Sequence, residues 1–562
     1  MLDPINYAKD TARELVLAAI NSARSDGALP QIEAAPFAIE IPADTSHGDF
    51  ASNAAMVNAR TFHMAPRAIA QAIVEHIAAD GNVFDRVEIA GPGFINFFVS
   101  RAYLGSVLHE VLKAKEEYGR TDSLAGQKIM VEYVSANPTG PMHMGNARGG
   151  ALGDCLASVL DACGADVTRE FYLNDAGNQI EKFAKSLEAR YLEIYDPSVE
   201  FPEDGYHGED IIERARGFNE IHGKTYLDKT PEERRKALVD YALPLNVEGL
   251  RRDLHTYRID YDVWFRESSL YADGMVNKVL GKLKDKGATY EKDGAVWYKA
   301  TDFGAEKDEV LVRSNGIPTY FAADIAYHYN KFAVRHFDRV INVWGADHHG
   351  HVARLKGAMN AVGLDGDKLD VVIMQMVRLV RDGQPVRMSK RTGKAITLTD
   401  LLEEIPIDAA RFFFNLREPG SHFDFDLDLA VSESSDNPVY YVQYAHARIC
   451  SILRNLRAEG IATDITDEFD ASLLVEPDEL ALIKHIAKLP SEISAAAREY
   501  DPARITRYSI ELASAFHRFY TTCRVKDCAE DLRRARIMLC NATRQTLSNC
   551  LALLKITAPE TM

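Results

Sequence analysis

The sequence predicts three folded parts in this order: a small α+β domain, a Rossmann-like α/β domain that carries an insertion, and an all-α bundle. The length of 562 residues suits about three or four domains of roughly 100–200 residues each. Two buried-strand patterns are each followed by a glycine-containing loop and a helical pattern, which is the opening half of a parallel βαβ unit. The expected bounds are residues 1–112, residues 113–435 with the insertion at about 185–310, and residues 436–562.

The first domain mixes a helix with short strands. An amphipathic pattern covers residues 11–22, and a strand-like run at 87–90 stops at Gly91-Pro92-Gly93 and resumes at 94–99. Helices and short strands joined by such turns are typical of an α+β fold. The helical stretch from Tyr103 to Glu117 predicts a linker helix into the second domain.

The second domain is predicted from strands that are followed by helices. Residues 128–135 have a buried-strand pattern, and the next helix should begin near Asn146 and end at Gly164, a natural C-cap. A second unit combines a strand at 339–344 with a helix that ends near Gly363.

A third strand and an insertion complete this domain. Residues 371–377 should lead into a hairpin at Asp382-Gly383, with 386–388 as the returning strand. About 170 residues separate the first two βαβ units, too many for a simple crossover, so we expect an insertion within the sheet. Its signals are a proline-initiated helix and two hairpin turns, at Thr230-Pro231, Asp293-Gly294 and Asn315-Gly316.

The last part has only helical periodicity. Asn437 and Pro438 form a cap and a first-turn proline, apolar residues follow at three- and four-residue steps, and Gly460 ends this helix. Further helices are expected to begin at Glu476, Ala503 and Asp531, which gives a helical bundle.

The amino-acid composition indicates which partners, which cellular location and which use of cysteine to expect. The net charge of −18 argues against non-specific binding of nucleic acid, yet residues 504–544 hold nine basic and four acidic side chains, a local field of +5. Apolar runs stay short of the ~18–20 residues that cross a bilayer, and residues 1–4 lack a secretory pattern, so we expect a cytoplasmic protein without a membrane partner. The seven cysteines lack CxxC spacing, which favours inert thiols over disulfides or a zinc site.

Two loops carry the candidate chemistry. The segment from Pro138 to Asn146 lies between a strand and a helix, where α/β sheets bind ligands. Gly145 permits a close approach to the backbone, and His143 and Asn146 can both donate hydrogen bonds to a phosphoryl group. The simpler alternative is that His143 is an ordinary capped loop residue.

The second loop, Arg387 to Lys394, is cationic and lies about 240 residues later. A lysine there suits a triphosphate, whereas a basic loop can also be only a solvated surface.

Taken together, these motifs resemble the arginyl-tRNA synthetases of the first synthetase class in their bacterial form. The class signatures His-Ile-Gly-His and Lys-Met-Ser-Lys-Ser stand here as HMGN and RMSKR. The stretches VEYVSANPTGPMHMGNARGGALGD, YVQYAHAR and CNATRQTLSNCLALLKITAPETM are similar to arginyl members, and GDFASNAAMVNAR and GPGFINF resemble their extra N-terminal domain. Asn146 departs from the second signature histidine, since an amide donates a hydrogen bond but carries no charge, and Arg387 replaces the first signature lysine.

The resemblance implies a two-step reaction with ATP, arginine and tRNA(Arg). Arginine would first react with ATP, accompanied by Mg²⁺, to give arginyl-adenylate and pyrophosphate, and the 2′-OH of the terminal tRNA adenosine would then accept the arginyl group and release AMP. It further implies that the first step requires bound tRNA. The expected catalytic residues are His143 and Asn146 at the α-phosphate and Lys390 at the β- and γ-phosphates. The full expected ATP site comprises Pro138, His143, Gly145, Asn146, Gly345, Asp347, Met376, Val377, Met388, Ser389 and Lys390.

The resemblance also maps an arginine pocket. Asp324 would pair with the guanidinium beside Tyr320, four residues earlier on the same helical face, while Ser135 and Asn137 would hold the α-amino and carboxylate end. The alternative for Asp324 is an acid that compensates a helix dipole. The full expected set is Glu132, Ser135, Asn137, Tyr320, Asp324 and His348.

Other interpretations stay open at this stage. Asp347, His348 and His351 could form a metal site and support metal-dependent hydrolysis, although we expect none, and Met376 and Val377 could be core residues. A tRNA-binding regulator derived from a synthetase would typically have eroded signatures.

The resemblance assigns anticodon binding to the C-terminal bundle and contact with the tRNA elbow to the N-terminal domain. Tyr440, Tyr441 and Tyr444 could stack on unpaired bases or could simply pack the first helix of the bundle. Related enzymes are usually monomers, and we expect the same here.

Overall fold

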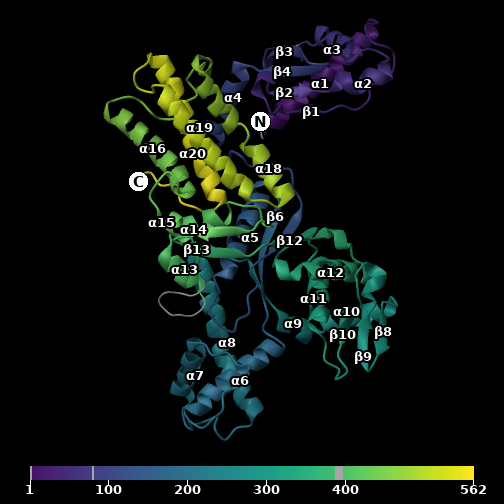
Figure 1. Cartoon of the computed structure of the whole chain (residues 1–562), viewed down its shortest axis with the longest axis vertical. Coiled ribbons are helices and arrows are strands. Elements are labelled where there is room, and N and C mark those ends of the chain that lie inside the picture. The colour runs from purple at the N-terminus through teal and green to yellow at the C-terminus, as the bar shows by residue number, and fades with distance from the viewer. Residues whose placement is uncertain (1–2, 79–80, 387–395) are drawn as a thin grey trace.

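The computed structural model describes residues 3–78, 81–386 and 396–562. The second signature loop, with the predicted ATP contacts Met388, Ser389 and Lys390, lies outside the described residues. Figure 1 shows the N-terminal domain at one end of a long molecule, beside the C-terminal helices, with the central sheet in the middle.

A five-stranded parallel sheet forms the centre of the protein, in the order β12-β11-β5-β6-β7. The chain adds β6 and β7 on one side of β5, and β11 and β12 on the other. The direction of winding therefore reverses between β5 and β11, which is the point where open α/β sheets bind ligands. The strands span Lys128–Glu132 (β5), Asp166–Leu173 (β6), Val263–Arg266 (β7), Arg339–Gly345 (β11) and Leu369–Met374 (β12).

The predicted insertion is interrupted by a strand of the sheet. β7 lies inside residues 185–310 and pairs in parallel with β6, so the additional elements form two groups, one before β7 and one after it. Figure 1 shows them as two separate lobes below the sheet. The first lobe holds α6 (Asn178–Glu193), α7 (Glu209–His222) and α8 (Pro231–Thr256); the second holds α9 (Glu267–Ala272), α10 (Met275–Asp285), β8 (Thr289–Lys292), β9 (Ala295–Tyr298) and β10 (Glu309–Val312).

Local sequence signals in these lobes are confirmed. Thr230 and Glu233 form a capping box at the start of α8. Asp293 and Gly294, both with positive φ, connect the antiparallel strands β8 and β9.

Helix α5 (Gly145–Ala162) follows β5 and is almost entirely buried. It lies so close to the strand that a Cβ on Gly153 would be 2.3 Å from Cγ of Tyr133. The next residue of the helix, Asp154, is fully buried and accepts hydrogen bonds from Arg411 at 2.6 Å and from Lys555 at 2.9 Å. The helix is thereby fastened to both the catalytic domain and the end of the C-terminal bundle. As expected, it stops just before Gly164, which has φ of +87°.

The second half of the catalytic domain completes the walls of the site. Asp382 and Gly383 form the predicted hairpin turn. The strand expected at 371–377 is instead divided between β12 and β13, which belong to different sheets, and the returning strand begins two residues earlier than expected, at Gln384. Val386 donates to the carbonyl of Leu379. The remaining elements are α11 (Tyr320–Tyr329), α12 (His349–Ala361), β13 (Val377–Arg381), β14 (Gln384–Pro385), α13 (Leu398–Glu404), α14 (Ile407–Phe414), β15 (Phe423–Asp426) and α15 (Leu427–Val431).

The N-terminal domain is α+β, as predicted. Three helices cover an antiparallel sheet in the order β1-β2-β4-β3. Its elements are α1 (Pro4–Ser25), β1 (Ile39–Glu40), β2 (Phe50–Ser52), α2 (Ala54–Phe62), α3 (Pro66–Glu75), β3 (Phe84–Ala90) and β4 (Phe94–Val99).

The predicted linker helix is α4 (Arg101–Ala114), and its end is fixed to the C-terminal bundle. The amide of Asn549 donates to the carbonyls of Lys115 and Tyr118, and the Tyr118 hydroxyl donates to the carbonyl of Ile486. The segment is therefore part of a packed interface and not a free connection.

The C-terminal part is a bundle of five long helices. They are α16 (Pro438–Ala458), α17 (Pro477–Ile486), α18 (Leu489–Glu499), α19 (Ala503–Thr522) and α20 (Glu530–Leu553). In the described ranges, we find no helix with the length and apolar character needed to cross a membrane.

Candidate active site

The chain leaves β5 through a strained turn. Val134 has φ of 70°, which is unfavourable for a β-branched residue, and the Ser135 N–H donates to the carbonyl of Tyr133 at 3.0 Å, which closes a γ-turn. Such backbone strain costs on the order of 1–3 kcal/mol and persists only where the surroundings enforce it. Here it redirects the chain at the switch point and places Ser135 at the edge of a hollow.

His143 lies at the start of α5, where its tautomer is defined by the backbone. Its Nδ1 accepts a hydrogen bond from the Gly145 N–H at 3.0 Å, so the proton is on Nε2. The exposed imidazole can therefore donate from Nε2 to an anion. The N-terminal turn of α5 adds a favourable dipole for negative charge. Asn146, also predicted at this site, is in that first turn and is partly exposed.

A segment that follows the second signature in the sequence lies beside the first signature. The Met144 N–H donates to the carbonyl of Ile396 at 3.0 Å, the Leu398 N–H donates to the carbonyl of Met142 at 2.9 Å, and His143 pairs with Thr397 in an antiparallel bridge. Residues 396–398 therefore lie beside His143.

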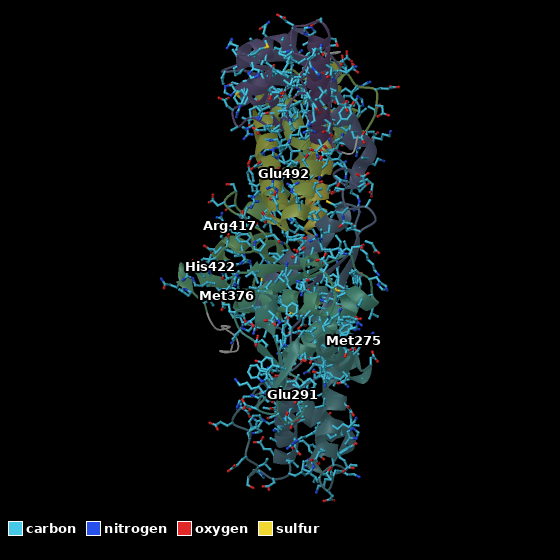
Figure 2. The ribbon with its side chains drawn as sticks, turned by 90° about the vertical axis from the view of Figure 1, so that its right-hand side faces the viewer. Met275, Glu291, Met376, Arg417, His422 and Glu492 are labelled. Carbon is cyan, nitrogen blue, oxygen red and sulfur yellow. The ribbon has the colours of Figure 1, made fainter. Side chains whose placement is uncertain are left out.

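A cleft of about 680 Å³ lies next to this contact. His143 and Met144 form one wall, Met376 and Val377 another, and His422 lies nearby; Figure 2 shows Met376 and His422 together on one side of the molecule. Met376 is 80% exposed, which favours the predicted ligand contact over a core position. Of the other predicted ATP contacts, Pro138 is buried behind the cleft, while Gly345 and Asp347 line the adjacent hollow.

The adjacent hollow has a volume of about 490 Å³ and lies at the carboxyl ends of β5 and β11. It brings together most of the predicted arginine contacts, which come from three separate segments of the chain. They are Glu132, Ser135, Asp324 and His348. Tyr320 lines a neighbouring hollow of about 390 Å³ together with Tyr271, and Asn137 is exposed.

Glu132 is held by a buried cation. Nζ of Lys331, which is 0% exposed, lies 2.5 Å from Oε2 of Glu132, and the Ser135 hydroxyl donates to Oε1 at 3.0 Å. Burial lowers the pKa of Lys331, and the Glu132 carboxylate acts in the opposite direction. Lys331 lies in a π-helical turn, a feature frequently found at functional sites.

The same network reaches Asp324 through its backbone. Lys331 also donates to Oδ1 of Asn342, the Asn342 amide donates to Nε2 of His328, and His328 donates from Nδ1 to the carbonyl of Asp324. Burial and the charge of Lys331 hold the pKa of His328 well below its usual value, so this histidine is neutral. Glu132 and Asp324, which both line the hollow, are therefore joined by one continuous set of buried and partly buried hydrogen bonds.

Asp324 has a carboxylate that faces the hollow and one side-chain partner there, since Nε2 of His351 lies 3.0 Å from its Oδ2. This bond separates the histidines that the sequence had suggested as metal ligands, because His348 instead lies beside Asp347 at 3.5 Å. Across the residues that the structure covers, no group of three or more His, Cys, Asp or Glu side chains is arranged to hold a metal ion.

Comparison with known proteins identifies the family. Three family models match: the arginyl tRNA synthetase N-terminal domain over residues 10–99, the class I (R) tRNA synthetase catalytic domain over 107–419, and the DALR anticodon binding domain over 442–562. The arginine–tRNA ligase of Acetivibrio thermocellus is 56% identical over 100% of both chains, and that of Caldanaerobacter subterraneus is 56% identical over 99% of both. The chain belongs to the arginyl-tRNA synthetase family. The Thermus thermophilus arginyl-tRNA synthetase has the same fold, with a TM-score of 0.74 and 24% identity over 97% of this chain and 99% of that one.

Within this family fold, the structure places a further carboxylate that sequence reasoning missed. Glu267 is 2% exposed and lies directly after β7, where the Tyr271 hydroxyl donates to it at 3.4 Å. Burial raises the pKa of Glu267 to about 7, and the nearby charges of Asp324 and Asp175 act in the same direction. It also bonds to Tyr172, so it lies between the hollow of Asp324 and that of Tyr271 and Tyr320. An acid directly after a strand is the available signal, but the sequence did not predict β7.

The predicted anticodon-contact tyrosines divide into two kinds. Tyr441 packs against the core and donates to the Ser514 hydroxyl at 3.2 Å. Tyr440 and Tyr444 are stacked with centroids 6.2 Å apart, and Tyr444 is 38% exposed. Arg448 lies beside Tyr444 and over the ring of Tyr520. Tyr444 is therefore the most accessible of the three rings.

The basic stretch at 504–544 is less free than its charge indicated. Arg504, Arg507, Lys526 and Arg536 form ion pairs with acids that lie outside this stretch. The net charge of +5 for residues 504–544 does not include these acids, which lie close to the basic side chains only in the folded chain.

Proposed function

We propose that this chain attaches L-arginine to tRNA(Arg) in two steps, with ATP as the energy source. The observation that carries the proposal is the hollow that brings Glu132, Ser135, Asp324 and His348 together at the carboxyl ends of β5 and β11, with the carboxyl of Glu267 buried close to Asp324. A guanidinium presents a planar fork of donors, which a carboxylate such as that of Asp324 matches in charge and in geometry.

At the arginine end, the guanidinium would lie between Asp324 and Glu267 with Tyr320 beside it. The α-amino group would lie toward Glu132 and Ser135, and Asn137 would be available at the exposed rim. Lys331 would hold the Glu132 carboxylate in its orientation. This arrangement directs the substrate carboxylate toward the cleft that contains His143.

At the nucleotide end, adenine would contact Met376 and Val377, and the ribose would lie toward Gly345 and Asp347. The α-phosphate would accept hydrogen bonds from Nε2 of His143 and from Asn146, next to Gly145 at the positive end of α5. Mg²⁺ would travel with ATP as part of the substrate, held mainly by the phosphates.

The chemistry needs positioning and charge stabilisation more than covalent help from the protein. An oxygen of the arginine carboxylate attacks the α-phosphorus, the bond to the bridging oxygen breaks, and pyrophosphate leaves. His143 and Asn146 stabilise the negative charge that develops on the α-phosphoryl oxygens. The 2′-OH of the terminal tRNA adenosine then attacks the arginyl carbonyl and AMP leaves. Lys390, by its sequence position, would bind the β- and γ-phosphates together with Met388 and Ser389.

The C-terminal bundle would bind the anticodon, with Tyr440 and Tyr444 as stacking faces and Arg448 as a neighbouring cation. The N-terminal domain would contact the tRNA elbow. A cytoplasmic location and a monomeric state stay predictions, and sedimentation with and without tRNA tests the second.

The deciding experiment measures arginine attachment by the purified protein with a tRNA(Arg) transcript, ATP and Mg²⁺. Pyrophosphate exchange with and without tRNA tests in parallel whether the first step requires bound tRNA. We expect arginyl-tRNA with arginine and none with lysine. If no arginyl-tRNA forms at saturating ATP and tRNA, the proposal is wrong.

A further inference from the structure

Helix α8 belongs to two hydrophobic cores at once. Its first half contributes Leu238 and Ala242 to the core of the lobe formed by α6, α7 and this half of α8, which we call the helical lobe. Its second half contributes Val247, Leu250 and Leu254 to the main core of the catalytic domain. In Figure 1 the helix rises from the lower lobe toward the central sheet.

The change from one core to the other occurs at a proline. Pro244 lies inside α8, where it removes one backbone hydrogen bond and its ring crowds the carbonyl of Asp240. Such a position is where a helix bends most easily. The two halves of α8 are therefore joined at a position where the helix can bend.

The first residue after this point that faces inward is Asn246, which is 6% exposed and contacts the signature loop. Its amide Nδ2 donates to the carbonyl of Pro138 at 3.0 Å. The orientation of the amide is fixed by α7, because Nε of Arg214 donates to Oδ1 of Asn246 at 3.0 Å. A single buried side chain thus joins α7, α8 and the loop that carries His143.

A second contact between the lobe and the loop lies close by. Oδ2 of Asp210, in the first turn of α7, is 3.5 Å from the point that a Cβ on Gly140 would occupy. This oxygen is buried and, among the described residues, has no hydrogen-bond partner. The lobe thus approaches the loop at both Pro138 and Gly140.

We propose that Asn246 is a positioning residue for the nucleotide site, through which the helical lobe sets the placement of the loop from Pro138 to His143. This inference rests on the proposed function, since it concerns the same reaction. His143 follows Pro138 by five residues, and a displacement of reacting groups by about 1 Å can cost on the order of a hundredfold in rate. Arg214 orients Asn246 and would affect the placement of the loop only through that residue.

The test uses the full-length Asn246→Asp variant. The replacement has the same shape and keeps an acceptor for Arg214, but it loses the N–H that Pro138 requires. The matched control is Asn541→Asp in the C-terminal bundle, where a buried asparagine likewise donates to backbone carbonyls, those of Thr463 and Ile537. Both variants lose one buried amide donor and should have similarly lowered melting temperatures.

Two readouts distinguish positioning from a general loss of stability. In pyrophosphate exchange at saturating tRNA, we expect Asn246→Asp to lower kcat about tenfold or more and to raise the ATP KM, with the arginine KM within twofold of wild type. Hydrogen exchange, which needs no activity, should be at least about fivefold faster in the segment 138–147 of this variant only. Asn541→Asp should leave both readouts unchanged.

Unchanged exchange in the segment 138–147 overturns the proposal, as does a kcat for Asn246→Asp within twofold of wild type. An equal effect of the two variants does so as well. A wild-type protein that forms no arginyl-tRNA would instead count against the proposed function, while the exchange experiment would still decide the role of Asn246.

Discussion

Replacing Asp324 with asparagine should weaken arginine binding while leaving ATP binding almost unchanged. Asparagine has the same size and keeps an oxygen for His351, whose Nε2 lies 3.0 Å from Oδ2 of Asp324. What is lost is the negative charge opposite the guanidinium. The substitution therefore tests electrostatic recognition separately from packing.

The size of the effect follows from burial. Hydrogen bonds to charged groups contribute about 1.5–3 kcal/mol, and neutral ones about 0.5–1.5 kcal/mol. The Asp324 side chain is 34% exposed, so solvent screens part of the interaction. We therefore expect a loss of about 1–2 kcal/mol, which corresponds to a rise of about 5- to 30-fold in the arginine KM.

The assay is pyrophosphate exchange at saturating tRNA, with arginine and ATP varied in turn. The matched control is Asp347→Asn in the same hollow, our proposed ribose contact, whose side chain is 81% exposed. Asp324→Asn should change the arginine KM, and Asp347→Asn should change mainly the ATP KM. Equal effects of Asp324→Asn on both substrates would remove Asp324 from the guanidinium site.

Two further predictions concern ionisation and stability. Burial raises the pKa of Glu267 to about 7, so this carboxyl is largely protonated below that pH and cannot pair with a guanidinium. The arginine KM should therefore fall as the pH rises from about 6 to 8. The Glu267→Gln variant should have a higher arginine KM that depends less on pH. A steep profile in Glu267→Gln would assign the titration to another group. Asp154→Asn leaves the buried Arg411 without its carboxylate and should lower the free energy of unfolding in urea by about 3–5 kcal/mol. Asp424→Asn breaks an exposed pair with Arg378 and should have a far smaller effect, so similar losses would contradict this account of Asp154.

The sequence predicted the parts of the fold that depend on local chemistry. Thr230, the hairpin at Asp293-Gly294 and the C-cap at Gly164 each determine backbone geometry within a few residues, and all three are confirmed. β7 was missed because it has only four residues, and nothing local distinguishes a short strand that joins the main sheet from one in an insertion.

The sequence indicated which residues form the candidate site, but not how their side chains are bonded to one another. Asp324, Ser135 and His143 could be chosen from motifs, and they lie in adjoining cavities. The bond between Lys331 and Glu132 links residues 199 positions apart, so no local pattern contained it. The same limitation explains the basic stretch at 504–544, whose acidic partners became evident only in the folded chain.

The contacts of the buried Asp154 have a consequence for the order in which the protein folds during its synthesis. Its carboxylate accepts a hydrogen bond from Lys555, 401 residues later, while Cys155 donates to the carbonyl of Leu554. Chains emerge from the ribosome N-terminus first and generally fold domain by domain in that order. The N-terminal domain can fold early, but Asp154 in α5 meets its partners Arg411 and Lys555 only after much more of the chain has been made. The packing of the helix that begins at the first signature is therefore completed only after the helical bundle that follows the catalytic domain has been made.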